Sequence, residues 1–307
     1  MSLKLRDLVA ATHTPFDAHG ELHLDAIETQ AAHLARNGVS AVFIGGTTGE
    51  SHSLTVEERL ALALRWSEVL KGTNTPWVVH VGANCLADAR TLARQAAQLG
   101  ATAIAALSPS YFKPRTVDAL VACCRHIAEV APETPFYFYD IPGMTGVSLP
   151  MDAFLVNSMG VIPTLAGIKF SNPDLMMFQH CLHQQYKRFD ILWGTDEYLL
   201  AAMAVGAEGA VGSSYNFAAP IYRRMMAAQA RGDSVTARVE QYRSVQVIHR
   251  LARHGYMAAA KAVMGWLGVP VGPPRLPHFD LTPDEPYALR DHLERMGFFD
   301  WIASAQP

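Results

Sequence analysis

The feature that most constrains the fold of this chain is an alternation of short apolar runs with longer helix-like segments, from the N-terminus to about residue 225. Short apolar runs bounded by turn residues are typical of buried strands. Each pair of neighbouring runs is separated by a helix-length crossover, as parallel strands require. Seven predicted strands are Leu8–His13, Ala41–Ile44, Trp77–Val81, Ala103–Leu107, Phe136–Tyr139, Ile191–Trp193 and Ala210–Gly212, and another ends at Lys169.

Eight consecutive β/α units predict an α/β fold of the TIM type, a (β/α)8 barrel over residues 1–225. The alternative is an open doubly wound sheet, but no Gly-x-Gly-x-x-Gly fingerprint follows the first strand. From about Pro220 only helical patterns remain, so residues 226–307 are expected to form a C-terminal helical extension. One predicted helix ends at Gln229, and three further helices are predicted over Val239–His254, Met257–Leu267 and Pro286–Met296.

Composition argues against several functional classes. With a net charge of −3 and 17% charged residues, the chain gives no electrostatic reason to bind nucleic acid or a membrane surface. No apolar run is long enough to span a bilayer, and the 13 histidines lack metal-ligand spacing, so we expect no metal. Four cysteines without paired spacing and the absence of a signal-like N-terminus favour a cytoplasmic location.

Lys169 is the first candidate for chemistry, because it stands inside a short apolar run, whereas the other five lysines have helical or loop-like surroundings. Burial disfavours the ammonium form, and a neutral amine condenses with a ketone or aldehyde to give a Schiff base. The alternative is a structural lysine that reaches solvent or pairs with a carboxylate. Lys261, the second candidate, lies in an apolar helix, where a structural role is favoured.

Other polar residues follow the predicted strands, where barrel active sites form. The Gly45–Gly49 loop is either a cradle for a carboxylate or only a tight turn. An inward Tyr139 needs a partner for its hydroxyl, either as a proton shuttle near Lys169 or as a core tyrosine bonded to backbone. The candidates besides Lys169 and Tyr139 are Thr47, Thr48, Tyr111, Asp196, Glu197, Ser213 and Ser214. The acidic pair Asp196 and Glu197 either caps a helix or binds a polyhydroxylated ligand.

Three motifs together resemble the dihydrodipicolinate synthase/N-acetylneuraminate lyase family of class I aldolases. They are Gly45–Ser51 (GGTTGES), Tyr139–Pro142 (YDIP) and Gly167–Lys169 (GIK), and Gly272–Arg275 (GPPR) also agrees. The resemblance implies a barrel, usually a homotetramer, in which the strand-six lysine forms a Schiff base with pyruvate without metal or cofactor.

Carried over by position, the resemblance makes Lys169 the Schiff-base lysine and Tyr139 the proton shuttle. It implies that Thr47 and Thr48 hold the pyruvate carboxylate. Tyr111 matches a tyrosine that reaches the site of a neighbouring subunit.

Departures within the family favour a sugar acid as substrate. Met144 stands where dihydrodipicolinate synthases typically have an arginine for the second carboxylate, and a thioether cannot make that contact. The stretches around Lys169, Gly194 and Ser213 resemble sialic acid lyases, which implies sugar contacts from Gly194, Asp196, Glu197 and Ser213, with Ser171 nearby. Asp140 stands where many relatives have asparagine or histidine, which by itself indicates no function.

The predicted activity is therefore the cleavage of N-acetylneuraminate to pyruvate and N-acetylmannosamine. Alternatives within the family are another pyruvate-dependent sugar-acid aldolase or dehydratase, or a dihydrodipicolinate synthase. A non-catalytic sugar-acid sensor is the alternative from a different class, but a sensor needs neither Lys169 nor Tyr139.

Overall fold

A computed structural model describes residues 3–184 and 188–303, in which eight parallel strands close into a barrel in sequence order. Strand β1 pairs with β8, with Leu8 opposite Ala210, and this pairing closes the sheet. The predicted (β/α)8 barrel is thereby confirmed. The strands are β1 (Asp7–Ala11), β2 (Ala41–Ile44), β3 (Trp77–His80), β4 (Ala103–Leu107), β5 (Phe136–Asp140), β6 (Leu165–Phe170), β7 (Asp190–Trp193) and β8 (Gly209–Gly212).

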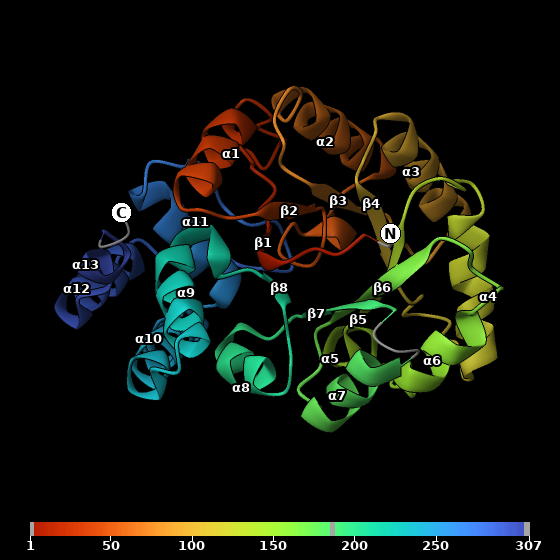
Figure 1. Ribbon diagram of the computed structural model, residues 1–307. Helices are drawn as coiled ribbons and strands as arrows, with labels where there is room; N and C mark the ends of the chain where they lie inside the picture. The colour runs from red at the N-terminus through yellow and green to blue at the C-terminus, as the bar shows by residue number, and fades with distance from the viewer. Residues whose placement is uncertain (1–2, 185–187, 304–307) are drawn as a thin grey trace.

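Helices surround the strands (Figure 1). Those between successive strands are α1 (Ala26–Arg36), α2 (Val56–Val69), α3 (Leu86–Gln98), α4 (Val117–Ala128), α5 (Pro142–Thr145), α6 (Met151–Ser158), α7 (Leu175–His183) and α8 (Leu199–Ala204). The described residues also include the short 3-10 helices η1 (Ser51–Ser53) and η3 (Asp196–Tyr198). Helix α2 begins as its sequence predicts, because Thr55 and Glu58 form a capping box in which each side chain accepts the other's backbone N–H.

The C-terminal region is helical, as expected, and lies on the side of the barrel near β1 and β8 (Figure 1). Its helices are α9 (Tyr215–Ala230), α10 (Ser234–Ala252), α11 (Tyr256–Trp266), α12 (Glu285–Met296) and α13 (Phe298–Ala303). Helix α9 spans residue 225, where the boundary of the extension is predicted. Helix α10 begins before the predicted Val239, because the Asp233 carboxylate accepts the Thr236 N–H at 3.0 Å and caps it.

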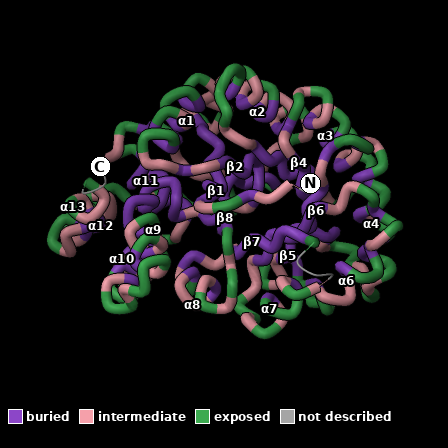
Figure 2. Tube along the Cα trace, viewed as in Figure 1, coloured by how far each residue is buried: buried purple, intermediate pink, exposed green. Residues whose placement is uncertain are grey.

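Two apolar layers make up the core, and β5 shows how its strand pattern separates them. Tyr137 and Tyr139 point into the barrel, whereas Phe136 and Phe138 face the helices, as the alternation predicts. The rings of Phe138 and Phe154 on α6 are 4.8 Å apart between centroids. Figure 2 shows that the strands are buried and that exposure is confined largely to the outer surfaces of the helices. Within the described ranges, no helix is both long and apolar enough to cross a membrane.

Candidate active site

Lys169 lies inside the barrel near the end of β6, and only 3% of its surface is exposed. Its Nζ is 4.0 Å from the centroid of the Phe43 ring and 3.9 Å from that of Tyr139. Burial lowers the pKa of Lys169, although Tyr139 and Asp196 favour its charged form and oppose this fall. A larger share of neutral amine is therefore present than at an exposed lysine.

A cavity of about 450 Å³ opens above Lys169 at the C-terminal ends of the strands. Nine of the ten residues expected in the site line it: Thr47, Thr48, Tyr139, Lys169, Ser171, Gly194, Asp196, Glu197 and Ser213. The exception is Tyr111. Ser214 does not line the cavity either, although its side chain lies directly behind it.

The loop after β2 presents Thr47 to Tyr139. Thr47 Oγ1 and the Tyr139 hydroxyl are 3.1 Å apart and share a hydrogen bond. The loop turns at Gly45, whose φ of +64° favours glycine, and the Ser51 N–H closes the turn by donating to the Gly46 carbonyl at 3.2 Å. The Tyr139 hydroxyl thus has a polar side-chain partner in the cavity, which is the arrangement expected of a proton shuttle.

The acidic pair after β7 has two different environments. Asp196 is buried, and its Oδ2 accepts the Ser214 N–H at 2.9 Å and the Ser214 hydroxyl at 2.5 Å. The side chain of Asp196 therefore does not cap the following helix. Burial raises the pKa of Asp196, and burial together with the charge of Asp196 raises that of the half-buried Glu197.

Two glycines make room for polar side chains of the cavity. A Cβ on Gly212 would lie 2.0 Å from Asp196 Oδ1, so only glycine lets this carboxylate lie against β8. A Cβ on Gly194 would lie 2.1 Å from the Ser171 hydroxyl oxygen. Neither collision could be relieved without moving the side chain that lines the cavity, so the glycines determine where Asp196 and Ser171 lie.

Sequence reasoning missed one wall of the cavity, which comes from α10 and α11 in the C-terminal region. Tyr256 lines it, and its hydroxyl lies 2.7 Å from the Ser213 hydroxyl oxygen. Ile248 and Ala252 add an apolar surface beside it. The helical pattern predicts these helices but gives no signal that their residues reach the barrel mouth.

Three residues singled out in the sequence lie away from the cavity within one chain. Tyr111 is 79% exposed, and its ring packs edge-on against the exposed Phe112 with centroids 4.9 Å apart. Met144 on α5 is 65% exposed. Asp140 is buried on the outer face of β5, where its carboxylate accepts the Asn172 side-chain N–H at 3.1 Å.

The cavity-lining residues contain one basic group, Lys169, and two acidic ones, Asp196 and Glu197. Nowhere in residues 3–184 and 188–303 do three His, Cys, Asp or Glu side chains come close enough to hold a metal ion.

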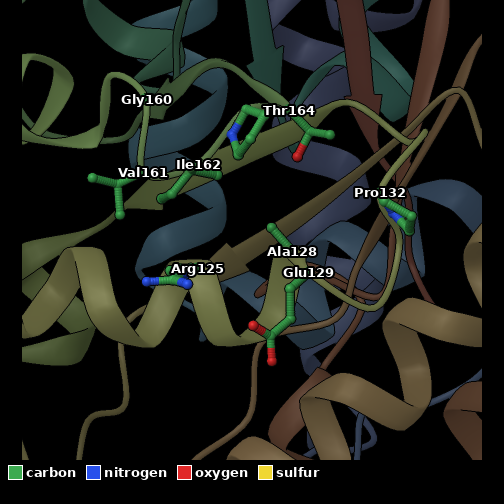
Figure 3. Close-up of a pocket in the computed structure, with 9 residues that line it drawn as sticks. Arg125, Ala128, Glu129, Pro132, Gly160, Val161, Ile162 and Thr164 are labelled. Atoms are coloured by element: carbon green, nitrogen blue, oxygen red, sulfur yellow. The ribbon is translucent and has the colours of Figure 1, made fainter.

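A second cavity of about 470 Å³ lies at the other end of the barrel, near the start of β6 (Figure 3). Arg125 and Ala128 of α4 and the following Glu129 line it opposite the segment Gly160–Thr164. Its lining contains no lysine, and Glu129 is already paired with Arg90. The cavity above Lys169 is therefore the better candidate of these two for an active site.

Comparisons with known proteins bear on the family of this chain. The sequence pattern of the dihydrodipicolinate synthetase family matches residues 4–296. An N-acetylneuraminate lyase from Gallus gallus is 41% identical over 278 residues, covering 89% of this chain and 90% of the relative.

Solved structures show the same fold along nearly the whole chain. An N-acetylneuraminate lyase from Proteus mirabilis superposes with a TM-score of 0.93 at 38% identity, covering 96% of this chain and 100% of that one. A dihydrodipicolinate synthase from Bacillus anthracis superposes with a TM-score of 0.88 at 26% identity, covering 99% of this chain and 100% of that one.

Proposed function

We propose that this chain, which belongs to the dihydrodipicolinate synthetase family, is a class I aldolase that cleaves N-acetylneuraminate to pyruvate and N-acetylmannosamine. The observation that carries the proposal is the buried Lys169 amine at the floor of a polar cavity, beside a tyrosine hydroxyl already bonded to Thr47. The lyases named above, at 38–41% identity, support the choice of substrate.

In the proposed first step, neutral Lys169 Nζ attacks the ketone carbon of the substrate. The resulting carbinolamine loses water and becomes a protonated Schiff base, and Tyr139 shuttles the protons. Thr47 and Thr48 hold the adjacent carboxylate with hydroxyl and backbone N–H donors.

Carbon–carbon cleavage follows, because the protonated Schiff base accepts the electron pair of the bond that breaks. Tyr139, which has given its proton to the departing water, removes the proton from the hydroxyl beside that bond, and N-acetylmannosamine leaves as the aldehyde. The enamine left on Lys169 takes up at carbon the proton that Tyr139 now carries. Addition of water to the resulting Schiff base releases pyruvate and the free amine of Lys169, and Tyr139 recovers its proton. Protons and electrons balance without a metal or redox cofactor.

The rest of the cavity suits a neutral polyhydroxylated chain. Asp196 Oδ2 already has two donors from Ser214, and in this proposal the Asp196 carboxylate also accepts a substrate hydroxyl. Glu197, Ser213 and the backbone at Gly194 offer further partners, and Ser171 lies nearby. A second substrate carboxylate would instead meet two acidic side chains in a partly desolvated cavity, which is electrostatically unfavourable.

The covalent step is tested by reduction with borohydride in the presence of pyruvate, followed by peptide mass mapping. We expect the adduct on Lys169, and we expect the folded Lys169→Ala variant to form none and to lose turnover. Lys261, the other buried lysine of the described residues, is an internal control that should stay unmodified. An adduct on Lys261, or on no lysine, would contradict the mechanism.

Substrate choice is tested separately, by comparing N-acetylneuraminate, other 2-keto-3-deoxy sugar acids, and pyruvate with aspartate semialdehyde. Preference for the last pair would overturn the substrate assignment while leaving the lysine chemistry intact. A homotetramer in the cytoplasm is part of the same proposal, and it rests on the family resemblance and the cysteine pattern.

A further inference from the structure

Glu50 and Lys261 form an ion pair in the protein interior, outside the lining of the active-site cavity. Lys261 Nζ lies 2.6 Å from Glu50 Oε1, and the exposed fractions of the two side chains are 1% and 0%. Both side chains carry a large desolvation cost, and apolar residues often stabilise such positions equally well. General stability therefore does not explain why charges occupy these two positions.

The other contacts of this pair lead to the loop that carries Thr47. Lys261 Nζ also donates to the carbonyls of Thr14 at 3.0 Å and Pro273 at 3.1 Å, so it has two hydrogen bonds besides the ion pair. The Thr14 hydroxyl in turn donates to the Gly49 carbonyl at 2.6 Å. Lys261 on α11 is thus connected to both Gly49 and Glu50, at the end of the loop after β2.

Glu50 has a backbone conformation that needs such support. Its φ is +53°, in the left-handed region that non-glycine residues seldom adopt. Its N–H donates to the Thr47 carbonyl at 3.0 Å, and this bond closes the turn that presents the Thr47 side chain to Tyr139. A residue that holds the Glu50 carboxylate therefore also holds the turn at Thr47.

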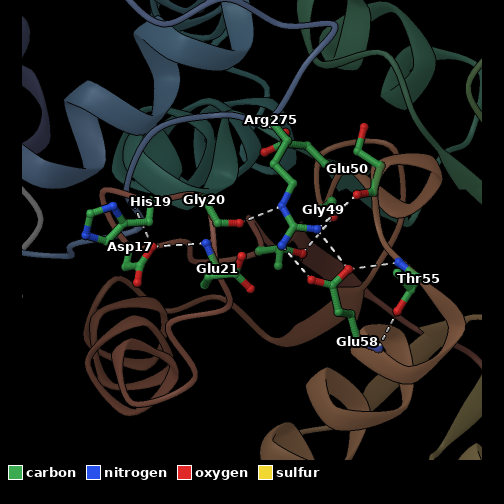
Figure 4. A network of polar contacts seen from close by, with 11 residues as sticks. Asp17, His19, Gly20, Glu21, Gly49, Glu50, Thr55, Glu58 and Arg275 are labelled. Atoms are coloured by element: carbon green, nitrogen blue, oxygen red, sulfur yellow. Dashed lines mark hydrogen bonds and ion pairs between the residues drawn. The ribbon is translucent and has the colours of Figure 1, made fainter.

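The segment that contains Pro273 contacts the loop from outside through Arg275 (Figure 4). The backbone N–H of Arg275 donates to Glu50 Oε2 at 2.8 Å. The Arg275 guanidinium pairs with both carboxylate oxygens of Glu58, at 2.5 and 2.8 Å, and donates to the Gly20 carbonyl. Both oxygens of Glu50 are thus bound by residues that follow the barrel in sequence.

We propose that Glu50 and Lys261 are positioning residues that fix the Gly45–Ser51 loop, and through it Thr47, against Tyr139. The C-terminal region then supplies part of the active-site geometry, in addition to the cavity wall formed by Tyr256. The effect on turnover rests on the proposed function, whereas the effect on the loop does not.

The test uses the Glu50→Gln/Lys261→Met double variant of the full chain, which removes both charges and leaves no unpaired buried ion. We expect it to fold. Hydrogen exchange at the Glu50 and Ser51 amides, which close the turn, should be at least about tenfold faster. Misplacement of positioning groups reduces catalysis by up to roughly 100-fold, so kcat/KM for N-acetylneuraminate should fall by about 10- to 100-fold. A variant that is only less stable would keep kcat and KM per folded molecule.

Glu240→Gln is the matched control, because Glu240 is another buried carboxylate, held by Arg224 and Arg243. It should leave loop exchange and kcat/KM unchanged. The proposal is overturned if the double variant exchanges and turns over like the unmodified protein, or if Glu240→Gln has the same effects.

Two further outcomes remain decisive. If the double variant does not fold, Glu50→Gln alone serves instead, since it removes the charge of Glu50 and leaves Lys261 its hydrogen bonds to the Thr14 and Pro273 carbonyls. Unchanged exchange at Glu50 and Ser51 in that variant overturns the proposal. If the unmodified protein cleaves no N-acetylneuraminate, the proposed function fails, and the exchange measurements still decide whether the pair positions the loop.

Discussion

At the residue scale, Tyr139 separates proton transfer from packing, because its ring and its hydroxyl have different neighbours. The ring packs edge-on against Phe43 and His80, with centroids 5.7 and 5.8 Å away, while the hydroxyl contacts Thr47. Tyr139→Phe should keep the packing and delete the proton shuttle. General acid–base groups contribute roughly 100- to 10,000-fold, so steady-state kinetics should show kcat lowered within that range.

The same strand provides the control for this variant. Tyr137 also points into the barrel, but its hydroxyl donates to Asp190 at 2.7 Å, below the cavity. Tyr137→Phe should lower stability and leave kcat nearly unchanged. A Tyr139→Phe enzyme with normal kcat and a raised KM would assign Tyr139 to binding and contradict the mechanism.

At the scale of the element, β5 carries the proposed proton shuttle on one face and a buried carboxyl with a raised pKa on the other. Burial raises the pKa of Asp140 to about 6, despite the hydrogen bond from Asn172. Because the carboxyl of an unfolded chain titrates near 3.8, the folded state holds an extra proton between these values. Stability attributable to Asp140 is therefore present at low pH and is lost as the pH rises through about 6.

Asp140→Asn should remove this pH dependence. Urea unfolding of both proteins from pH 4 to pH 7 should show the unmodified protein losing up to about 3 kcal/mol relative to the variant, since one pKa unit corresponds to about 1.4 kcal/mol. The buried Asp190 carboxyl, whose pKa is also raised to about 6, is common to both proteins and cancels in the difference. Parallel pH profiles would show that Asp140 is ionised as easily in the folded chain as in the unfolded one.

At the scale of the whole molecule, the exposed Tyr111–Phe112 pair is the feature that a single chain leaves unexplained. Exposed fractions of 79% and 86% are high for adjacent aromatic residues, and Tyr111 does not reach the cavity of its own chain. In the proposed homotetramer, Tyr111 would instead complete the site of a neighbouring subunit.

Complementation between two weakened variants tests this arrangement. Tyr111→Ala removes the donated ring and Lys169→Ala removes the nucleophile, so each protein alone should have little activity. After the two are mixed, unfolded and refolded together, some sites combine an intact Lys169 with an intact Tyr111, and activity should reappear. Activity no higher than the sum of the separate proteins would contradict a shared site, and Lys169→Ala mixed with itself is the control.

The sequence alone determined the fold and the chemical centre of this protein. The alternation of strand and helix patterns predicts the barrel, because the spacing of apolar residues along the chain distinguishes strands from helices. Lys169 and Tyr139 are predicted for a related reason: a polar residue in a short apolar strand must be buried, and the ends of parallel strands meet at one barrel mouth. The structure places both there.

Only the tertiary structure decided which distant residues meet at that mouth. Tyr256 contacts Ser213, 43 residues away, and Lys261 contacts Thr14, 247 residues away. Asp196 turns toward Ser214 and does not cap its own helix. These contacts depend on how the C-terminal helices pack on the barrel and on the direction each loop side chain takes. Local sequence preferences limit that packing and those directions but do not specify them, because the deciding contacts join residues far apart in the chain.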